Sequence, residues 1–167
     1  MISKFFPDAY YKSVHHVDYN ALSSEGITNL IFDIDNTLAP FDTPGPDQQC
    51  VQLLGRLSKQ GFNVCLLSNN KATRVDTFNA DLGLVCVSHA KKPGSRGLKQ
   101  ALALLGNAPP NKCALIGDQL FTDIWCARRN GLRAVLVLPI AQRDEFWVKL
   151  KRHAERPLLQ LYKTKPK

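Results

Sequence analysis

Acidic side chains end two of the hydrophobic runs in this sequence, at a spacing that could support chemistry on phosphate. In the stretch LIFDIDNTLAPFD, an apolar run leads into Asp33, and Asp35 and Thr37 follow at alternate positions. A later run, KCALIG, is followed by Asp118, with Asp123 shortly beyond. Carboxylates brought together repel one another and resist ionising, a problem that a bound cation relieves. Oxygen ligands without cysteine or histidine favour Mg²⁺.

Polar donors follow two further hydrophobic runs. Ser68, Asn69 and Asn70 come after FNVCLL, and Lys91 and Lys92 come after LVCVSHA. Each group alone has an ordinary structural explanation, because Ser-Asn-Asn suits a turn and most lysines are exposed. Hydroxyl and ammonium donors beside clustered carboxylates are, however, what a phosphoryl group requires. Together these residues indicate a site for phosphoryl transfer.

The elements that must position these residues alternate along the chain. The expected strands are apolar on both faces, which is typical of a parallel sheet covered by helices. The polar residues all lie at the carboxyl ends of strands, where such sheets bind ligands. The sequence therefore predicts an α/β fold, with a doubly wound, Rossmann-like, mostly parallel five-stranded sheet and helices on both faces. Strands are expected at 29–35, 62–68, 84–88, 112–118 and 133–139, and helices at 48–61, 71–83, 95–106 and 122–131.

The length of 167 residues fits one domain over 1–167, with a core at about 27–141 and a basic extension at 142–167. Thirty-two residues separate Asp35 from Ser68, and 23 separate Ser68 from Lys92. The predicted helices and strands fill both intervals, so we expect no cap domain and an open site. An open site admits phosphate on a bulky molecule, and a homo-oligomer could supply a lid from a second subunit.

Composition favours an intracellular protein. The five cysteines are scattered without a CxxC spacing, as in reduced proteins, and no apolar run resembles a secretory signal or a membrane span. The expected location is the cytoplasm. Of the net charge of +8, residues 142–167 carry eight basic and three acidic side chains, a net of +5. This excess suggests peripheral contact with an anionic membrane at its inner face, or simply a solvated tail; contact with nucleic acid is the weaker expectation.

The motifs resemble those of the haloacid dehalogenase superfamily of phosphatases. DIDNT resembles its DxDxT motif, LLSNN its strand ending in Ser or Thr, KKP its motif lysine and IGDQLFTD its GDxxxxD motif. All four occur in the family's order over residues 33–123. The whole chain is similar to the small, capless, class III phosphatases of the YqeG type, which are related to the phosphatidylglycerophosphate phosphatases.

This resemblance implies roles for the residues that match the motifs. Asp33 would be the nucleophile that forms an aspartyl-phosphate, and Asp35 the general acid that protonates the leaving oxygen and then activates water. Lys92 would neutralise charge on the nucleophile and the phosphoryl group. It is preferred to its neighbour because family members place the motif lysine directly before proline. Ser68, Asn69 and Lys92 would bind the phosphate.

The resemblance also implies a metal site. Asp33 and Asp118 would bind Mg²⁺ through their carboxylates, and Asp35 through its main-chain carbonyl. Asp123 would be a further ligand or a supporting residue, and Thr37 would brace the loop that follows the first of these strands. The presence of Asp35 favours the phosphatases, because the dehalogenase members of the superfamily lack an acid there.

The leading interpretation is a Mg²⁺-dependent phosphomonoesterase, with phosphatidylglycerophosphate as the suggested substrate. The alternatives are a phosphatase acting on a soluble phosphometabolite, a phosphoprotein or a nucleic-acid end, and a non-catalytic protein associated with RNA or ribosomes. A response-regulator receiver is disfavoured, because the acid and the lysines follow the wrong strands. Arg74 could reach a substrate, but the favoured interpretation is a solvated arginine in the first turn of a helix.

Overall fold

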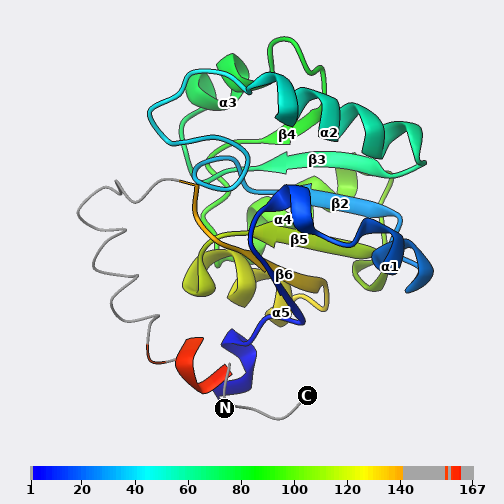
Figure 1. Ribbon diagram of the computed structural model, residues 1–167, viewed down its shortest axis with the longest axis vertical. Helices are drawn as coiled ribbons and strands as arrows, with labels where there is room; N and C mark the ends of the chain where they lie inside the picture. The colour runs from blue at the N-terminus through cyan, green and yellow to red at the C-terminus, as the bar shows by residue number, and fades with distance from the viewer. Residues whose placement is uncertain (1, 141–156, 158, 163–167) are drawn as a thin grey trace.

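The computed structural model describes residues 2–140, 157 and 159–162. A parallel sheet of six strands runs through the molecule in the order β1-β6-β5-β2-β3-β4 (Figure 1). The predicted α/β fold with a parallel sheet is therefore confirmed. The strands are β1 (Ala9–Tyr11), β2 (Asn29–Phe32), β3 (Asn63–Leu67), β4 (Val85–Val87), β5 (Cys113–Gly117) and β6 (Arg133–Val137).

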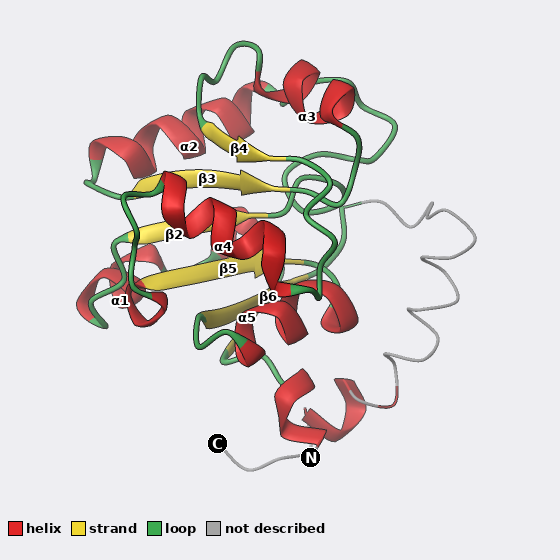
Figure 2. Cartoon of the chain, turned by 180° about the vertical axis from the view of Figure 1, so that it is seen from behind, coloured by secondary structure: helices red, strands yellow, loops and turns green. Residues whose placement is uncertain are grey.

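Helices cover both faces of this sheet, as Figures 1 and 2 show from opposite sides. Side chains of α1, α2 and α3 belong to the hydrophobic cluster on one face, and those of α4 and α5 to the cluster on the other. The α-helices are α1 (Tyr19–Ser24), α2 (Gln48–Lys59), α3 (Ala72–Asn79), α4 (Ser95–Leu104) and α5 (Trp125–Arg129). Short 3₁₀ turns occupy Ile2–Phe5, Val14–His16 and Pro110–Lys112, and a π-helical turn occupies Leu120–Ile124.

The sheet has one strand more than the five predicted. The additional strand, β1, lies at the edge and pairs in parallel with β6, with Ala9 opposite Val135. Its three residues are all half-buried, so neither an apolar run nor an alternating pattern marks them in the sequence. A strand this short carries too little periodicity to be recognised.

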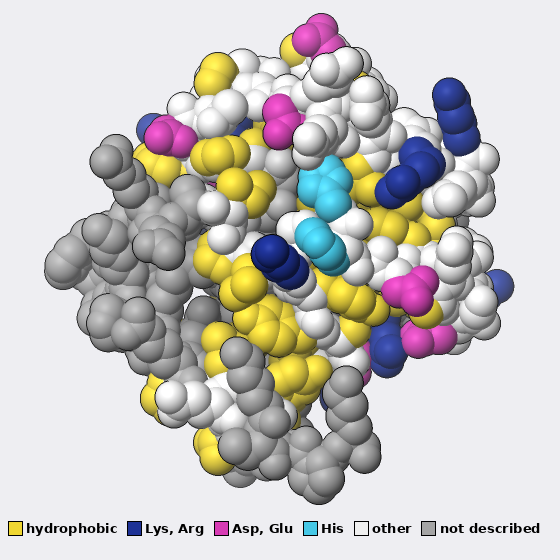
Figure 3. Space-filling model, in the orientation of Figure 1, with side chains coloured by type: hydrophobic (Ala, Val, Ile, Leu, Met, Phe, Trp, Pro, Cys, Tyr) yellow, Lys and Arg dark blue, Asp and Glu magenta, His cyan; other side chains and the backbone are white. Residues whose placement is uncertain are grey.

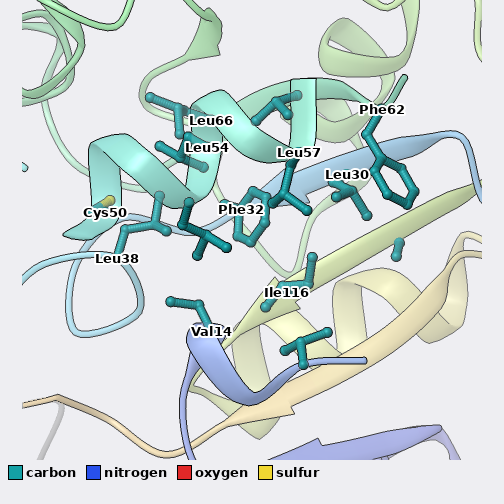
Figure 4. Packing of buried hydrophobic residues seen from close by; sticks show 14 of the residues in the cluster. Val14, Leu30, Phe32, Leu38, Cys50, Leu54, Leu57, Phe62, Leu66 and Ile116 are labelled. Carbon is teal, nitrogen blue, oxygen red and sulfur yellow. The ribbon is translucent and has the colours of Figure 1, made fainter. Parts of the chain in front are cut away.

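The alternation of side chains along β2 links the two halves of the core. Leu30 and Phe32 point into the cluster that contains α2, whereas Ile31 points into the cluster that contains α4 and α5. All three are fully buried, and Figure 4 shows Leu30 and Phe32 packed against Leu54 and Leu57 of α2. A strand buried on both faces is held rigidly, so the residue that follows it is placed accurately.

The order of the strands reverses at β2. The chain passes from β2 to β3 and β4 on one side, and then crosses over to β5 and β6 on the other. Ligand sites in parallel sheets lie at such a switch point, at the carboxyl ends of the strands. Here the backbone N–H of Asp33 donates to the carbonyl of Ile116 at 3.0 Å, which joins the two strand ends.

The intervals that could have held a cap domain contain only the elements already named. Residues 36–67 form a loop, α2 and β3, and residues 69–91 form α3, β4 and their connections. Most of the basic extension expected at 142–167 lies outside the described residues, but Leu159 packs against the core. Within the described part of the chain, no helix is both long and apolar enough to cross a bilayer.

Candidate active site

Three buried carboxylates converge at the switch point. Asp33 follows β2, Asp118 follows β5, and Asp123 lies in the π-helical turn beyond β5. Each offers one oxygen, and these oxygens all lie within 4.8 Å of one another. We call these three residues the acidic cluster. Their side chains come from two neighbouring strand ends, as the sequence analysis expected.

Lys92 reaches the acidic cluster from the loop after β4. Its Nζ lies 2.6 Å from Oδ1 of Asp33 and 2.7 Å from Oδ1 of Asp123, and Lys92 is buried. Burial alone would lower the pKa of Lys92, but the carboxylates of Asp123 and Asp33 outweigh it and raise that pKa. The ammonium therefore stays charged. Lys91, in contrast, is exposed.

The acidic cluster carries more negative charge than Lys92 can balance. The pKa of Asp33 is raised to about 7, chiefly because burial removes water from the carboxylate; Lys92 opposes this shift and Asp123 adds to it. Three buried carboxylates facing one ammonium fit a divalent cation held by oxygen ligands. The acidic cluster is therefore a candidate metal site.

Thr37 connects two members of this cluster. Its Oγ1 lies 3.3 Å from Oδ1 of Asp118 and 3.5 Å from Oδ2 of Asp33, and the side chain is buried. One hydroxyl proton can serve only one of these carboxylates at a time. Thr37 thus lies between the ends of β2 and β5. The role expected for it, bracing the loop after the first of these strands, stays a prediction.

The position of Asp123 depends on the π-helical turn. Its Oδ2 accepts the backbone N–H of Gln119 at 3.1 Å, and its side chain has no exposed surface. Gly117 leaves the space it needs, because a Cβ on Gly117 would lie 2.4 Å from Cγ of Asp123. Asp123 was predicted to lie at the start of an α-helix over 122–131, and no sequence pattern indicated that the turn would be π-helical. Single π-helical turns of this kind are frequent at functional sites.

The loop after β3 contributes Ser68, Asn69 and Asn70. Ser68 is buried, and its Oγ accepts the backbone N–H of Asn70 at 3.0 Å. The side chain of Asn69 bonds the backbone of Lys92 twice, accepting from its N–H at 2.7 Å and donating to its carbonyl at 3.1 Å. The Asn69 side chain thus fixes the segment that carries Lys92.

Asp35 stands apart from the acidic cluster. Its carboxylate accepts from Nε of Arg74 at 3.1 Å and from Nδ2 of Asn70 at 3.3 Å. Arg74 is not the solvated residue that the sequence suggested, because only 13% of its side chain is exposed. Its partner is 39 residues away, so only the fold reveals the pair.

Several of these groups line an open pocket of about 270 Å³ at the carboxyl edge of the sheet, whereas Asp118, Thr37 and Arg74 are not among its lining residues. Its walls bring carboxylates, an ammonium, a hydroxyl and amides together around a space large enough for a phosphoryl group. The predicted site residues lining it are Asp33, Asp35, Ser68, Asn69, Lys92 and Asp123.

Comparison with known proteins agrees with this geometry. The HAD-hydrolase-like family matches residues 89–145. The chain is 32% identical to "Probable phosphatase YqeG" of Bacillus subtilis, over 99% of this chain and 96% of that protein. It is 33% identical to "Phosphatidylglycerophosphate phosphatase 1, chloroplastic" of Chlamydomonas reinhardtii, over 81% of this chain and 58% of that protein.

A solved structure shows the same fold. The cobalt-bound form of a deoxy-D-mannose-octulosonate 8-phosphate phosphatase from Haemophilus influenzae superposes with a TM-score of 0.52 at 17% identity, covering 83% of this chain and 90% of the other. At that identity the likeness concerns the fold alone. With the full-length match to the Bacillus protein, it confirms the resemblance found in the motifs: the chain is a phosphatase of the YqeG family within the HAD superfamily.

Proposed function

We propose that the protein is a Mg²⁺-dependent phosphomonoesterase that works through an aspartyl-phosphate on Asp33. The observation that carries the proposal is the pair of short contacts from Lys92 Nζ, 2.6 Å to Asp33 and 2.7 Å to Asp123, inside a cluster of three buried carboxylates. Such an arrangement places the nucleophile beside a fixed positive charge, which phosphoryl transfer requires.

In the first step, a carboxylate oxygen of Asp33 forms a bond to phosphorus while the bond from phosphorus to the leaving oxygen breaks. Asp35 donates a proton to that oxygen, and the alcohol departs. Lys92 lies where it can offset the charge on the phosphoryl oxygens. Ser68 and Asn69 line the same pocket and supply polar groups to it.

In the second step, water attacks the phosphorus of the aspartyl-phosphate, and Asp35 accepts the proton from the water. Inorganic phosphate leaves and Asp33 returns as a carboxylate. Asp33, Asp118 and Asp123 would hold Mg²⁺ through their side chains, with the main-chain carbonyl of Asp35 as a further ligand. When bound, Mg²⁺ stabilises the charge on the phosphoryl oxygens.

For the substrate we propose phosphatidylglycerophosphate, because the relative from Chlamydomonas reinhardtii carries the name of a phosphatase for it. A second pocket, of about 600 Å³, supports a lipid substrate. The loop that bears Asn36 and Phe41 on the phosphate side also lines this pocket through Leu38 and Ala39. Val14, Leu138 and Ile140 add apolar groups to the lining, and Lys12, His15, His16 and Asp47 add polar ones. In the view of Figure 3, hydrophobic side chains surround a pair of histidines near the centre. Contact of residues 142–167 with an anionic membrane stays a prediction.

The decisive variant is Asp33→Asn, which keeps the shape of the side chain but removes the nucleophile. We expect turnover to fall to background while the melting temperature stays close to that of the parent. Asp76→Asn, an exposed change on α3, is the matched control and should keep full activity. An Asp33→Asn protein as active as the parent would rule out the mechanism.

The substrate proposal has its own test. Lipid, sugar, nucleotide and peptide phosphates are offered at equal concentration, with Mg²⁺ or with EDTA. We expect phosphatidylglycerophosphate in mixed micelles to be hydrolysed best and EDTA to stop every reaction. A clear preference for a soluble phosphate would reject the lipid substrate and leave the phosphatase mechanism standing.

A further inference from the structure

Arg74, in the first turn of α3, contacts the carboxylate of Asp35, which lines the pocket. Its Nε and Nη2 both lie 3.1 Å from Oδ1 of Asp35. Nδ2 of Asn70 donates to the other oxygen, Oδ2, at 3.3 Å. Both oxygens of Asp35 are therefore held by donors that follow β3, although Asp35 itself follows β2.

The guanidinium of Arg74 is itself fixed by two other contacts. Its Nη1 donates to the main-chain carbonyl of Pro44 at 2.7 Å, and its Cζ lies 5.5 Å from the ring centroid of Phe78. Phe78 is fully buried, so that contact rests on the core. A side chain locked in this way sets the orientation of the group it touches.

We propose that Arg74 is a positioning residue that aims Asp35 at the leaving-group oxygen. The inference rests on the proposed function of this site. Proton transfer requires the carboxyl group within hydrogen-bond reach of the leaving oxygen and correctly oriented. Asp35 is 23% exposed in its side chain, and the contacts with Arg74 and Asn70 restrict how that side chain can turn.

This role predicts an effect that depends on the leaving group. An aryl phosphate such as p-nitrophenyl phosphate releases a stable anion and needs little protonation, whereas an alkyl phosphate such as glycerol 3-phosphate needs a proton donor. The ratio kcat/KM covers the steps up to departure of the alcohol, so it isolates the step in which Asp35 acts as an acid. For Arg74→Met we expect kcat/KM to fall about 10–100-fold with the alkyl ester and less than about threefold with the aryl ester.

Two further variants separate orientation from charge. Arg74→Lys keeps the charge but cannot contact Asp35 and Pro44 together, so we expect the same selective loss as in Arg74→Met. Asn70→Ser removes the second donor to Asp35 and should show a smaller loss of the same kind, which keeps the inference testable if Arg74→Met fails to fold. Arg56→Met, an exposed change on α2, is the matched control and should leave both ratios unchanged.

The outcomes are distinguishable. An equal loss of kcat/KM on both esters would mean that Arg74 contacts the phosphate or only supports the fold. Full kcat/KM on the alkyl ester in Arg74→Lys would mean that the charge of the side chain alone matters. Either result overturns the positioning role. Asp33→Asn must be inactive on both esters. If the parent hydrolysed no phosphate monoester with Mg²⁺, neither these two esters nor phosphatidylglycerophosphate, the proposed function would fail and this inference with it.

Discussion

Lys92 is the residue on which the charge balance of the site depends. It is buried and contacts Asp33 and Asp123, yet these two and Asp118 place three acids beside a single ammonium. The pKa of Asp33 is raised to about 7, chiefly by burial; Lys92 opposes the shift and the neighbouring carboxylate of Asp123 adds to it. A nucleophile must be ionised, so the site needs the second source of positive charge that a divalent cation provides.

This imbalance predicts how pH acts on stability. Because the pKa of Asp33 is about 7 in the folded protein and 3.8 ordinarily, the folded state keeps a proton that the unfolded chain has released between these values. The free energy of unfolding of the metal-free protein should therefore fall as the pH rises through that window. Mg²⁺ binds the ionised carboxylates, so it should stabilise the protein more at about pH 8 than at about pH 5.5.

Thermal unfolding in EDTA and in MgCl₂ measures this effect. At a Mg²⁺ concentration about 100 times its Kd, the melting temperature at high pH should rise by about 5–10 °C. Asp118→Asn removes one proposed ligand and should lose most of this rise. A rise of equal size at both pH values, or one that persists in Asp118→Asn, would contradict the assignment of the acidic cluster as the metal site.

Single residues differ in how far the sequence could predict them. Asp33 and Asp118 could be found because each directly follows an apolar strand. Spacing could not decide between Lys91 and Lys92, and only the resemblance to a family made the choice. The backbone at Lys91 takes a positive φ of 55°, a local turn that spacing does not reveal. Arg74 was missed because its partners lie on segments that only the tertiary fold brings together.

At the scale of elements, long apolar runs were predictable and short or irregular elements were not. The buried strands β2, β3 and β5 have enough consecutive apolar residues to stand out from the rest of the chain. The edge strand β1 and the π-helical turn Leu120–Ile124 have no such signal, because pairing and packing with distant segments define them. Most of the predicted site residues nevertheless lie together, because they follow the long strands; their roles stay predictions.

The junction between β5 and the π-helical turn gives an element-scale prediction. A methyl group on Gly117 would lie 2.4 Å from Cγ of Asp123, so Gly117→Ala must displace that carboxylate. Its partner Lys92 lies 2.7 Å from Asp123 and should shift as well. Because small misplacements in an active site are costly, we expect kcat to fall by about 100-fold.

Gly55→Ala is the matched control for this change. Gly55 lies within α2, and a methyl group there would meet nothing within 4 Å. Alanine favours a helix interior, so this variant should be more stable by about 0.5–1 kcal/mol with unchanged kcat. Steady-state kinetics and urea denaturation of both variants make the comparison. Full activity in Gly117→Ala would show that Asp123 does not need its present position.

At the scale of the whole molecule, the first residues of the chain complete the sheet. Asp8 precedes β1, and its backbone N–H donates to the carbonyl of Ala134 at 2.8 Å while its Oδ2 accepts the N–H of Ala134 at 2.8 Å. Its Oδ1 forms ion pairs with Arg128 and Arg133. The start of the chain is thus fastened to β6 and α5, although the sequence analysis placed the core only from about residue 27.

Removing this fastening should weaken the fold measurably. Asp8→Ala leaves the backbone N–H of Ala134 and the guanidinium of Arg128 without their acceptor and removes one of the two acids beside Arg133. The free energy of unfolding should therefore fall by about 2–3 kcal/mol. Glu25→Ala is the control, because Glu25 also pairs with Arg133, at 3.0 Å, but is 43% exposed. An exposed pair contributes at most about 1 kcal/mol, so its loss should be much smaller. Urea denaturation followed by circular dichroism measures both. Equal losses would mean that Asp8 acts as a surface charge, and that β1 is held to the sheet by its backbone pairing with β6 alone.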